Sequence, residues 1–212
     1  MPLVYQQNIN FTTKLGVWHI AEGKDFFLQQ VPLQRQITHP HKQLQHLAGR
    51  YLLKELYPDF PYELIRIADT RKPFLENEAY HFSISHCGDY AAVLVSSTKR
   101  VGVDVELVTQ KVARVKHKFL SGKEQEMIML IDSSIIHFLY DSMFTAAWSI
   151  KESLYKWYGD GEVDFIEHLH IDDIALTDNT GIAHCTVFKK SPVNLLVHIL
   201  FFNNNCISWV VS

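Results

Sequence analysis

Two carboxylate side chains lie two residues apart in a segment where acidic and apolar residues alternate, Gly-Val-Asp-Val-Glu. They are Asp104 and Glu106. Alternation of this kind predicts a β-strand, in which side chains at positions i and i+2 leave the same face about 7 Å apart. Carboxylate oxygens suit Mg²⁺, so this face could hold a hard cation. The alternative is an ordinary strand with one hydrated acidic face. In both cases we expect the core side of the strand to carry Val103, Val105 and Leu107.

A third carboxylate and a cation occur further along the chain, in the segment WSIKESLYK at residues 148–156. Glu152 and Lys156 are four residues apart, so both side chains would leave one face of a helix. One interpretation is a further metal ligand beside a cation for an anionic substrate. The other is a surface ion pair worth roughly 0.3–0.5 kcal/mol.

Groups that could donate to an anion occur at four positions in the first half of the chain. Arg50 lies near the apolar stripe of a predicted helix, where a guanidinium either extends into solvent or reaches an anion. Lys72 precedes a proline, which restricts it to extended conformations. Ser85 and His86 come just before a glycine that would permit a tight turn. Each of these residues also fits an ordinary surface position.

The elements that must position these residues are a mixture of helices and strands in both halves of the chain. Residues 4–30 read as strands with a short helix, and leucines at helical spacing predict a helix over residues 42–57. Ser121 and Glu124 have capping-box spacing at the start of a helix predicted over 121–131, and a longer helix is predicted over 136–158. We expect a turn at residues 85–89. Strands are predicted at 81–85, 91–97, 101–108, 168–176, 184–190, 194–202 and 206–212.

Composition excludes several classes of protein. The 212 residues carry a net charge of −3 and include no long basic run, so nothing indicates a nucleic-acid partner. Three cysteines without CxxC spacing argue against a disulfide framework or a zinc site. We find no signal-peptide pattern at the N-terminus and no apolar run of the roughly 18 residues that a membrane span needs. We therefore expect a soluble, cytoplasmic protein without a membrane partner.

Taken together and in order, these segments resemble the Sfp-type (surfactin-synthetase-activating) 4′-phosphopantetheinyl transferases. The two hallmark blocks of that family are similar to GVDVE at 102–106 and WSIKESLYK at 148–156. Three further blocks are also similar: LAGRYLL at 47–53, KPFL at 72–75 and FSISHCG at 82–88.

The resemblance implies an α+β fold of two similar α/β halves related by a pseudo-two-fold axis, with mainly antiparallel sheets and a long helix in each half. We expect the halves to be residues 1–102 and 103–212, with the active site in the cleft between them. Metal ligation by Asp104, Glu106 and Glu152 is implied, with Glu152 and Lys156 as catalytic residues. The implied contacts to the phosphates of coenzyme A come from Arg50, Lys72, Ser85, His86 and Lys156.

The sequence departs from the family pattern at one of these blocks. The residue before Lys72 is usually glycine in this family, whereas here it is Arg71, so the loop could bend differently. Arg35 and Lys42 are candidates for the 3′-phosphate of coenzyme A. Glu124 lies where the family often has an acidic residue near the metal, but its capping-box position explains it equally well, and we leave it out of the site.

The implied activity is that of a holo-carrier-protein synthase. A carrier-protein serine would attack the β-phosphate of coenzyme A in a Mg²⁺-dependent reaction that releases 3′,5′-ADP, as in fatty-acid or secondary-metabolite biosynthesis. Carrier proteins of this kind are typically acidic, so a basic stretch made of Lys111, Arg114, Lys116 and Lys118 is a candidate docking site. Alternatives are a Mg²⁺-dependent phosphohydrolase or nuclease, and an inactive homologue that binds coenzyme A or the carrier. A chain holding both halves could act as a monomer.

Overall fold

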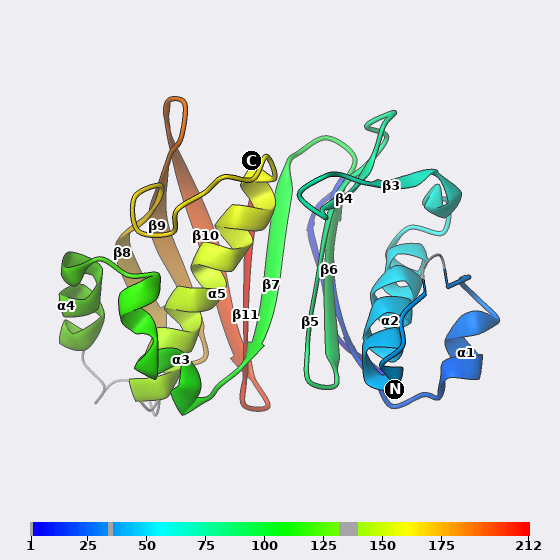
Figure 1. Cartoon of the computed structure of the whole chain (residues 1–212), viewed down its shortest axis with the longest axis horizontal. Helices are drawn as coiled ribbons and strands as arrows, with labels where there is room; N and C mark the ends of the chain where they lie inside the picture. Colours follow the sequence, from blue (N-terminus) through cyan, green and yellow to red (C-terminus); the bar gives the residue numbers. More distant parts are fainter. Residues whose placement is uncertain (1, 34–35, 132–139) are drawn as a thin grey trace. The chain divides into compact units, whose positions relative to one another are not determined.

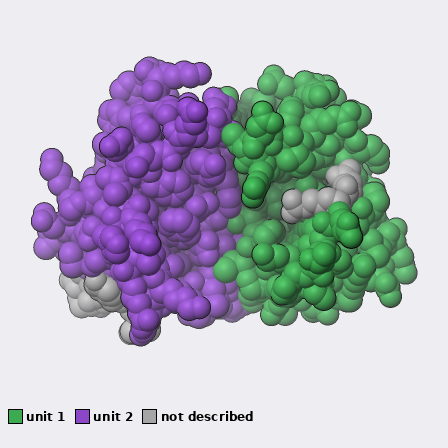
Figure 2. All heavy atoms as spheres, viewed as in Figure 1, with its two compact units in different colours: residues 1–101 green, residues 102–212 purple. Residues whose placement is uncertain are grey.

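The computed structural model of this protein describes residues 2–33, 36–131 and 140–212 (Figure 1). The chain divides into two compact units, residues 1–101 and 102–212 (Figure 2). Each unit has its own hydrophobic core, an antiparallel sheet and one long helix. The predicted α+β class with mainly antiparallel sheets is therefore confirmed. The pseudo-two-fold relation and the division into two domains after residue 102 stay predictions.

The first unit contains a four-stranded sheet in the order β1-β2-β6-β5 and a two-stranded ribbon of β3 and β4. All strand pairs in it are antiparallel. Its elements are β1 (Leu3–Asn10), β2 (Thr13–His19), α1 (Lys24–Leu28), α2 (Pro40–Leu56), the 3-10 turn η1 (Tyr62–Leu64), β3 (Ile65–Ile67), β4 (Pro73–Leu75), β5 (His81–Cys87) and β6 (Tyr90–Ser96).

The long helix of the first unit is α2, which confirms the helix predicted over residues 42–57. It begins two residues earlier, at Pro40, because proline suits the first helical turn and the His39 side chain accepts a hydrogen bond from the Lys42 amide at 3.5 Å. Its apolar stripe is buried against the sheet. The helix can approach β5 closely at Gly49, because a Cβ atom there would lie only 2.7 Å from the Ile84 side chain.

The end of β5 differs from the prediction. We expected a turn over residues 85–89, but β5 continues to Cys87, and only Gly88 and Asp89 connect it to β6. Gly88 has φ of +52°, a conformation that favours glycine. Because consecutive side chains of a strand point to opposite faces, Ser85 and His86 are not presented together. Ser85 is buried and His86 is exposed.

The second unit contains a five-stranded antiparallel sheet in the order β7-β11-β10-β9-β8. The four strands predicted from residue 168 onward are confirmed, and they form successive hairpins. Its elements are β7 (Val101–Leu107), α3 (Gln110–Arg114), the 3-10 turn η2 (Lys116–Lys118), α4 (Gly122–Leu130), α5 (Tyr140–Tyr158), β8 (Leu169–Thr177), β9 (Thr180–Phe188), β10 (Pro192–Phe202) and β11 (Asn205–Val211).

Two predicted helices of the second unit are present. The capping box of α4 is confirmed: the Ser121 hydroxyl accepts from the Glu124 amide at 3.3 Å, and the Glu124 carboxylate accepts from the Ser121 amide at 2.7 Å. The helix predicted over 136–158 is described as α5 from Tyr140 onward, and residues 136–139 lie outside the described residues. This helix packs across one face of the sheet (Figure 1). Within the described residues, no helix combines the length and apolar content required to cross a bilayer.

Candidate active site

The close packing of α5 on β7 at Gly102 positions the acidic residues of the second unit. A Cβ atom at Gly102 would collide with the Ser153 carbonyl oxygen and would lie 2.7 Å from the Trp157 backbone nitrogen. Both contacts are to helix backbone, so only glycine fits at this point without displacing the helix. The glycine of the GVDVE block therefore allows α5 to approach the strand that carries Asp104 and Glu106.

Two side-chain contacts connect α5 to the carboxylates of β7. The Lys156 ammonium donates to Asp104 Oδ1 at 2.6 Å, and the Trp148 indole N–H donates to Glu106 Oε1 at 3.1 Å. Trp148 and Lys156 are eight residues apart, so they lie on one stripe of the helix. The structure thus brings the predicted strand and the predicted helix together through three of the residues that the sequence singled out, Asp104, Glu106 and Lys156, and through Trp148, which it did not.

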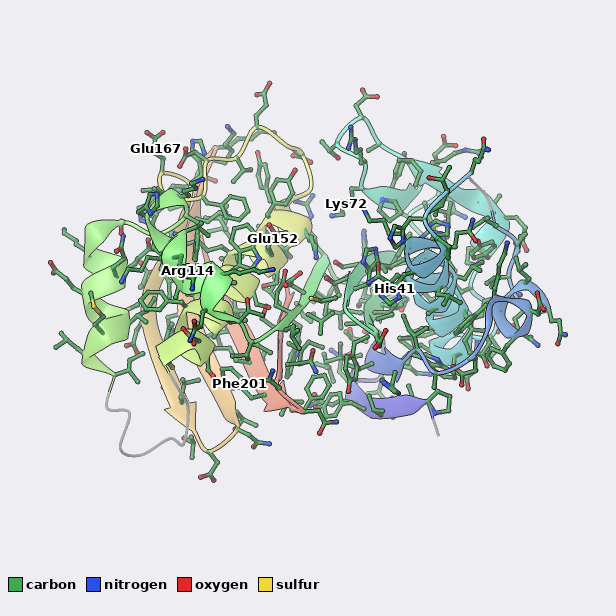
Figure 3. All side chains as sticks on the ribbon, turned by 60° about the horizontal axis from the view of Figure 1, so that its bottom comes forward. His41, Lys72, Arg114, Glu152, Glu167 and Phe201 are labelled. Atoms are coloured by element: carbon green, nitrogen blue, oxygen red, sulfur yellow. The ribbon has the colours of Figure 1, made fainter. Side chains whose placement is uncertain are left out.

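Glu152 lies midway along the same stripe, four residues from Trp148 and four from Lys156, and projects from α5 (Figure 3). Burial raises the pKa of the Glu152 carboxyl to about 7. This raised pKa already includes a lowering by Lys156 and smaller upward contributions from the negative charges of Asp104 and Glu106. Asp104, Glu106 and Lys156 thus lie within electrostatic range of Glu152, and these four residues form the candidate cluster.

The chemistry of this cluster suits a divalent cation. Three carboxylates supply the hard oxygen donors that Mg²⁺ prefers, and their mutual repulsion would be relieved by a positive ion. Within the described residues, however, no three His, Cys, Asp or Glu side chains are gathered closely enough to hold a metal. Metal ligation by Asp104, Glu106 and Glu152 therefore stays a prediction that the type of donor supports.

The surroundings of the acidic pair differ from those of a hydrated strand face. Asp104 is 2% exposed and Glu106 is half-buried, whereas Leu107, which we expected in the core, is 40% exposed. The prediction for Leu107 was wrong because β7 ends at this residue. At the end of a strand, the alternation of inward and outward side chains no longer decides whether a side chain is buried. Val103 and Val105 are buried as expected. A buried carboxylate needs a compensating charge, and Lys156 supplies it to Asp104.

A buried ion pair beside the cluster was not predicted. The Lys151 ammonium is fully buried and lies 2.8 Å from Glu124 Oε1, and it also donates to the Phe165 carbonyl at 2.8 Å. Glu124 Oε1 additionally accepts from the Ile171 amide at 2.9 Å. Burial lowers the pKa of Lys151, and the Glu124 carboxylate opposes this. Glu124 therefore joins α4, α5 and β8 besides capping α4, a role that its capping-box spacing did not reveal.

The predicted coenzyme A contacts of the first unit lie on three different elements. Arg50 on α2 is 7% exposed, so its side chain does not extend into solvent. Its guanidinium lowers the pKa of the Tyr62 hydroxyl, although burial has the larger effect and raises it. Lys72 lies in the turn that precedes β4 and is half-buried (Figure 3). Ser85 is 6% exposed. Arg35 falls outside the described residues.

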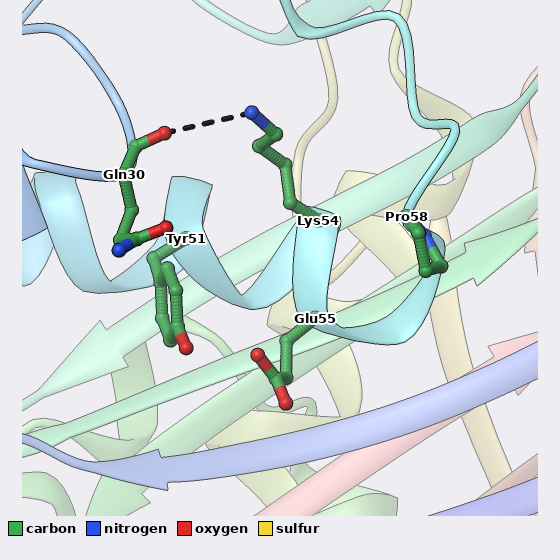
Figure 4. A pocket seen from close by; sticks show the side chains of 5 residues that line it. All are labelled: Gln30, Tyr51, Lys54, Glu55 and Pro58. Carbon is green, nitrogen blue, oxygen red and sulfur yellow. Dashed lines mark hydrogen bonds between the residues drawn. The ribbon is translucent and has the colours of Figure 1, made fainter.

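A pocket of about 220 Å³ lies on the second half of α2 (Figure 4). The lining residues are Gln30, Tyr51, Lys54, Glu55 and Pro58, and Lys54 donates to the Gln30 carbonyl at 3.5 Å. Burial raises the pKa of the Tyr51 hydroxyl to about 12, aided by a hydrogen bond and a charge interaction with Glu55. None of the predicted site residues lines this pocket, so we do not assign it to the candidate active site.

Comparison with known proteins gives the family. A model of the 4′-phosphopantetheinyl transferase superfamily matches residues 100–200, which include β7 and α5. The 4′-phosphopantetheinyl transferase AcpT of Escherichia coli O157:H7 is 24% identical over 182 residues, covering 82% of this chain and 88% of that protein. Enterobactin synthase component D of the same organism is 30% identical over 131 residues, covering 59% of this chain and 60% of that protein.

A vertebrate relative, the L-aminoadipate-semialdehyde dehydrogenase-phosphopantetheinyl transferase of Xenopus laevis, is 28% identical over 133 residues. The match covers 54% of this chain and 43% of that protein, so the chain spans about half the length of such relatives. Fold and site together define an α+β protein in which an acidic strand faces a lysine-bearing helix. Residues 100–200 of the chain match the 4′-phosphopantetheinyl transferase superfamily, and the chain is similar to the named members above. These relatives support the transferase interpretation and not a phosphohydrolase or nuclease.

Proposed function

We propose that this protein transfers the 4′-phosphopantetheine arm of coenzyme A to a serine of an acyl or peptidyl carrier protein. The observation that carries the proposal is the pairing of α5 with β7, in which Lys156 contacts Asp104 and Trp148 contacts Glu106, with Glu152 on the stripe between them. This arrangement occurs in the part of the chain that matches the transferase family. The pairing supports the proposal because it joins an acidic strand to a lysine-bearing helix, and chemistry on a diphosphate depends on charge neutralisation.

In the proposed reaction the serine oxygen forms a bond to the β-phosphorus of coenzyme A. The bond from that phosphorus to the bridging oxygen breaks, and 3′,5′-ADP leaves. We propose that Asp104, Glu106 and Glu152 hold Mg²⁺, which supplies charge neutralisation on the diphosphate oxygens when it is bound. Lys156 adds positive charge on the same side of the helix. We also propose Glu152 as the group that accepts the serine proton, besides its proposed role as a metal ligand.

The proposed contacts of coenzyme A with the first unit are Arg50, Lys72, Ser85 and His86. Lys72 and His86 are the more accessible members of this set, so substitutions there should weaken coenzyme A binding without unfolding the protein. Arg50 and Ser85 are nearly buried, so their substitution would also disturb packing. The cytoplasmic location, action as a monomer and absence of a nucleic-acid partner remain predictions.

We propose that an acidic carrier protein docks on the basic stretch of α3 and η2. Lys111, Arg114 and Lys118 are exposed there, whereas the Lys116 ammonium lies over the Phe144 ring at 4.5 Å from its centroid. Reversing the charge of the three exposed residues should raise the KM for the carrier protein. It should also make that KM less dependent on salt concentration. Reversal of Lys190, an exposed lysine between β9 and β10, is the matched control. An unchanged KM in the triple variant would exclude this docking surface.

The direct test is to incubate the protein with coenzyme A, Mg²⁺ and an apo-carrier protein and to measure the intact mass of the carrier. The expected result is a mass increase of one phosphopantetheine arm, with stoichiometric release of 3′,5′-ADP. The Asp104→Asn variant, which keeps the size of the side chain, should give no increase while retaining its circular dichroism spectrum. Release of 3′,5′-ADP without carrier modification would indicate a hydrolase. Coenzyme A binding without either product would indicate an inactive binding protein.

A further inference from the structure

The turn between β3 and β4 holds an arginine in a backbone conformation that favours glycine. Arg71 has φ of +67°, in the left-handed region. Two backbone hydrogen bonds define the turn: the Arg71 amide donates to the Ala68 carbonyl at 2.8 Å, and the Ala68 amide donates to the Lys72 carbonyl at 2.9 Å. A hairpin loop of this length commonly ends in a residue at positive φ, which is typically glycine. The loop therefore keeps a bend suited to glycine although the residue is arginine.

Arginine at this position is unfavourable for the backbone. A Cβ atom in the left-handed region crowds the neighbouring carbonyl, which is why Asn, Asp and Gly predominate there. Elsewhere in the described residues, Asp178, Asn203 and Asn204 adopt positive φ and are of tolerated types, whereas Glu78 and Glu162 adopt it and, like Arg71, are not. Strained backbone at a residue of an unfavourable type is often associated with a functional site.

The side chain of Arg71 does not offset this strain through an internal ion pair. It is exposed, and in the part of the chain that the structure describes no carboxylate lies within ion-pair distance of it. Arg66 in the same ribbon, by contrast, lies 3.7 Å from Glu76. Arg71 directly precedes Lys72, so one short turn carries two adjacent cations.

We propose that Arg71 is a second cationic contact, beside Lys72, for the phosphate groups of coenzyme A. The proposal rests on the proposed function, because it concerns the same substrate. A guanidinium presents parallel N–H donors to two phosphate oxygens at once, which an ammonium cannot do. In this proposal the Arg71 side chain binds an anion and does not stabilise the turn.

The experiment separates two effects of Arg71: its backbone strain, which lowers stability, and its proposed phosphate contact, which raises the affinity for coenzyme A. Arg71→Gly relieves the backbone, so Tm should rise by roughly 2–4 °C, while the Kd for coenzyme A, measured by calorimetry, should increase about fivefold. Arg71→Asn removes the charge in a residue that tolerates positive φ and should weaken binding equally. Arg71→Lys keeps the charge without the paired donors and should restore only part of the affinity. Glu78→Gly is the matched control: Glu78 also has positive φ (+50°), so Tm should rise with no change in Kd.

Repeating the titrations with 3′-dephospho-coenzyme A identifies the phosphate involved. If Arg71→Gly no longer affects the Kd, the contact is to the 3′-phosphate; an equal loss with both ligands assigns it to the diphosphate. Both results support the proposal. Wild-type Kd in Arg71→Gly and Arg71→Asn, with transfer activity intact, would overturn this inference and leave the proposed function standing. A wild-type protein that binds no coenzyme A would overturn both.

Discussion

Replacement of Gly102 by alanine tests whether the close approach of α5 to β7 creates the site. The added Cβ atom would lie 2.7 Å from the Trp157 nitrogen and closer still to the Ser153 carbonyl oxygen, whereas ordinary van der Waals contact begins at 3.4 Å. Both obstacles are backbone atoms of a regular helix, so they cannot rotate away. The helix must therefore move outward by at least about 0.7 Å, the difference between these two distances.

The displacement has two measurable consequences. Overpacking of this kind destabilises a protein by about 1–3 kcal/mol, which urea unfolding would measure. Glu152 and Lys156 move with α5, and a misplacement of about 1 Å can lower a catalysed rate on the order of 100-fold. We therefore expect Gly102→Ala to transfer phosphopantetheine about 100-fold more slowly per folded molecule, at a temperature well below its Tm.

Two other glycines of the same unit provide controls. A Cβ atom at Gly122 would meet nothing within 4 Å, so Gly122→Ala should leave stability and rate close to wild type. At Gly181 it would lie 2.9 Å from the Ala175 carbonyl oxygen, on the β8–β9 hairpin, so Gly181→Ala should lower stability while the folded fraction keeps its rate. If Gly102→Ala matched wild type in both measurements, or lost no more activity than Gly181→Ala at equal stability, the packing argument would be wrong.

Three further predictions concern charged and titratable groups. Lys151→Met leaves the buried Glu124 carboxylate without its cation, so urea unfolding should show a loss of about 3–5 kcal/mol, against less than about 0.5 kcal/mol for the exposed Lys123→Met. Lys156→Met should lower kcat for transfer about 100-fold, whereas a steady-state rate near wild type would contradict its role. The pKa of the Tyr51 hydroxyl is raised from 10 in the unfolded chain to about 12 in the folded protein. Between these values the folded protein keeps a proton that the unfolded chain loses. The stabilising contribution of Tyr51 is therefore fully present below pH 10 and declines up to about pH 12. Tyr51→Phe should lose less stability across that pH range, and parallel curves for the two proteins would refute the assignment.

Local patterns in the sequence were enough to predict most of the helices and strands. Helical spacing of leucines predicted α2, and the Ser121–Glu124 spacing predicted the start of α4, because these signals depend only on residues within one or two turns of helix. Turn chemistry was less reliable. The turn was predicted to start at Ser85 because of Gly88, but β5 continues to Cys87. A glycine indicates where a bend is possible and not where a strand loses its partner.

The sequence by itself also placed Asp104 with Glu106 on one strand face and Glu152 with Lys156 on one helix face. Residues two apart share a face of a strand, and residues four apart share a face of a helix. Only the tertiary structure decided that these two faces meet, that Asp104 is buried against Lys156, and that Lys151 pairs with Glu124, 27 residues away. Such contacts depend on how closely separate elements pack. Here that distance depends on the missing side chain of Gly102, whose partners lie about 50 residues further along the chain.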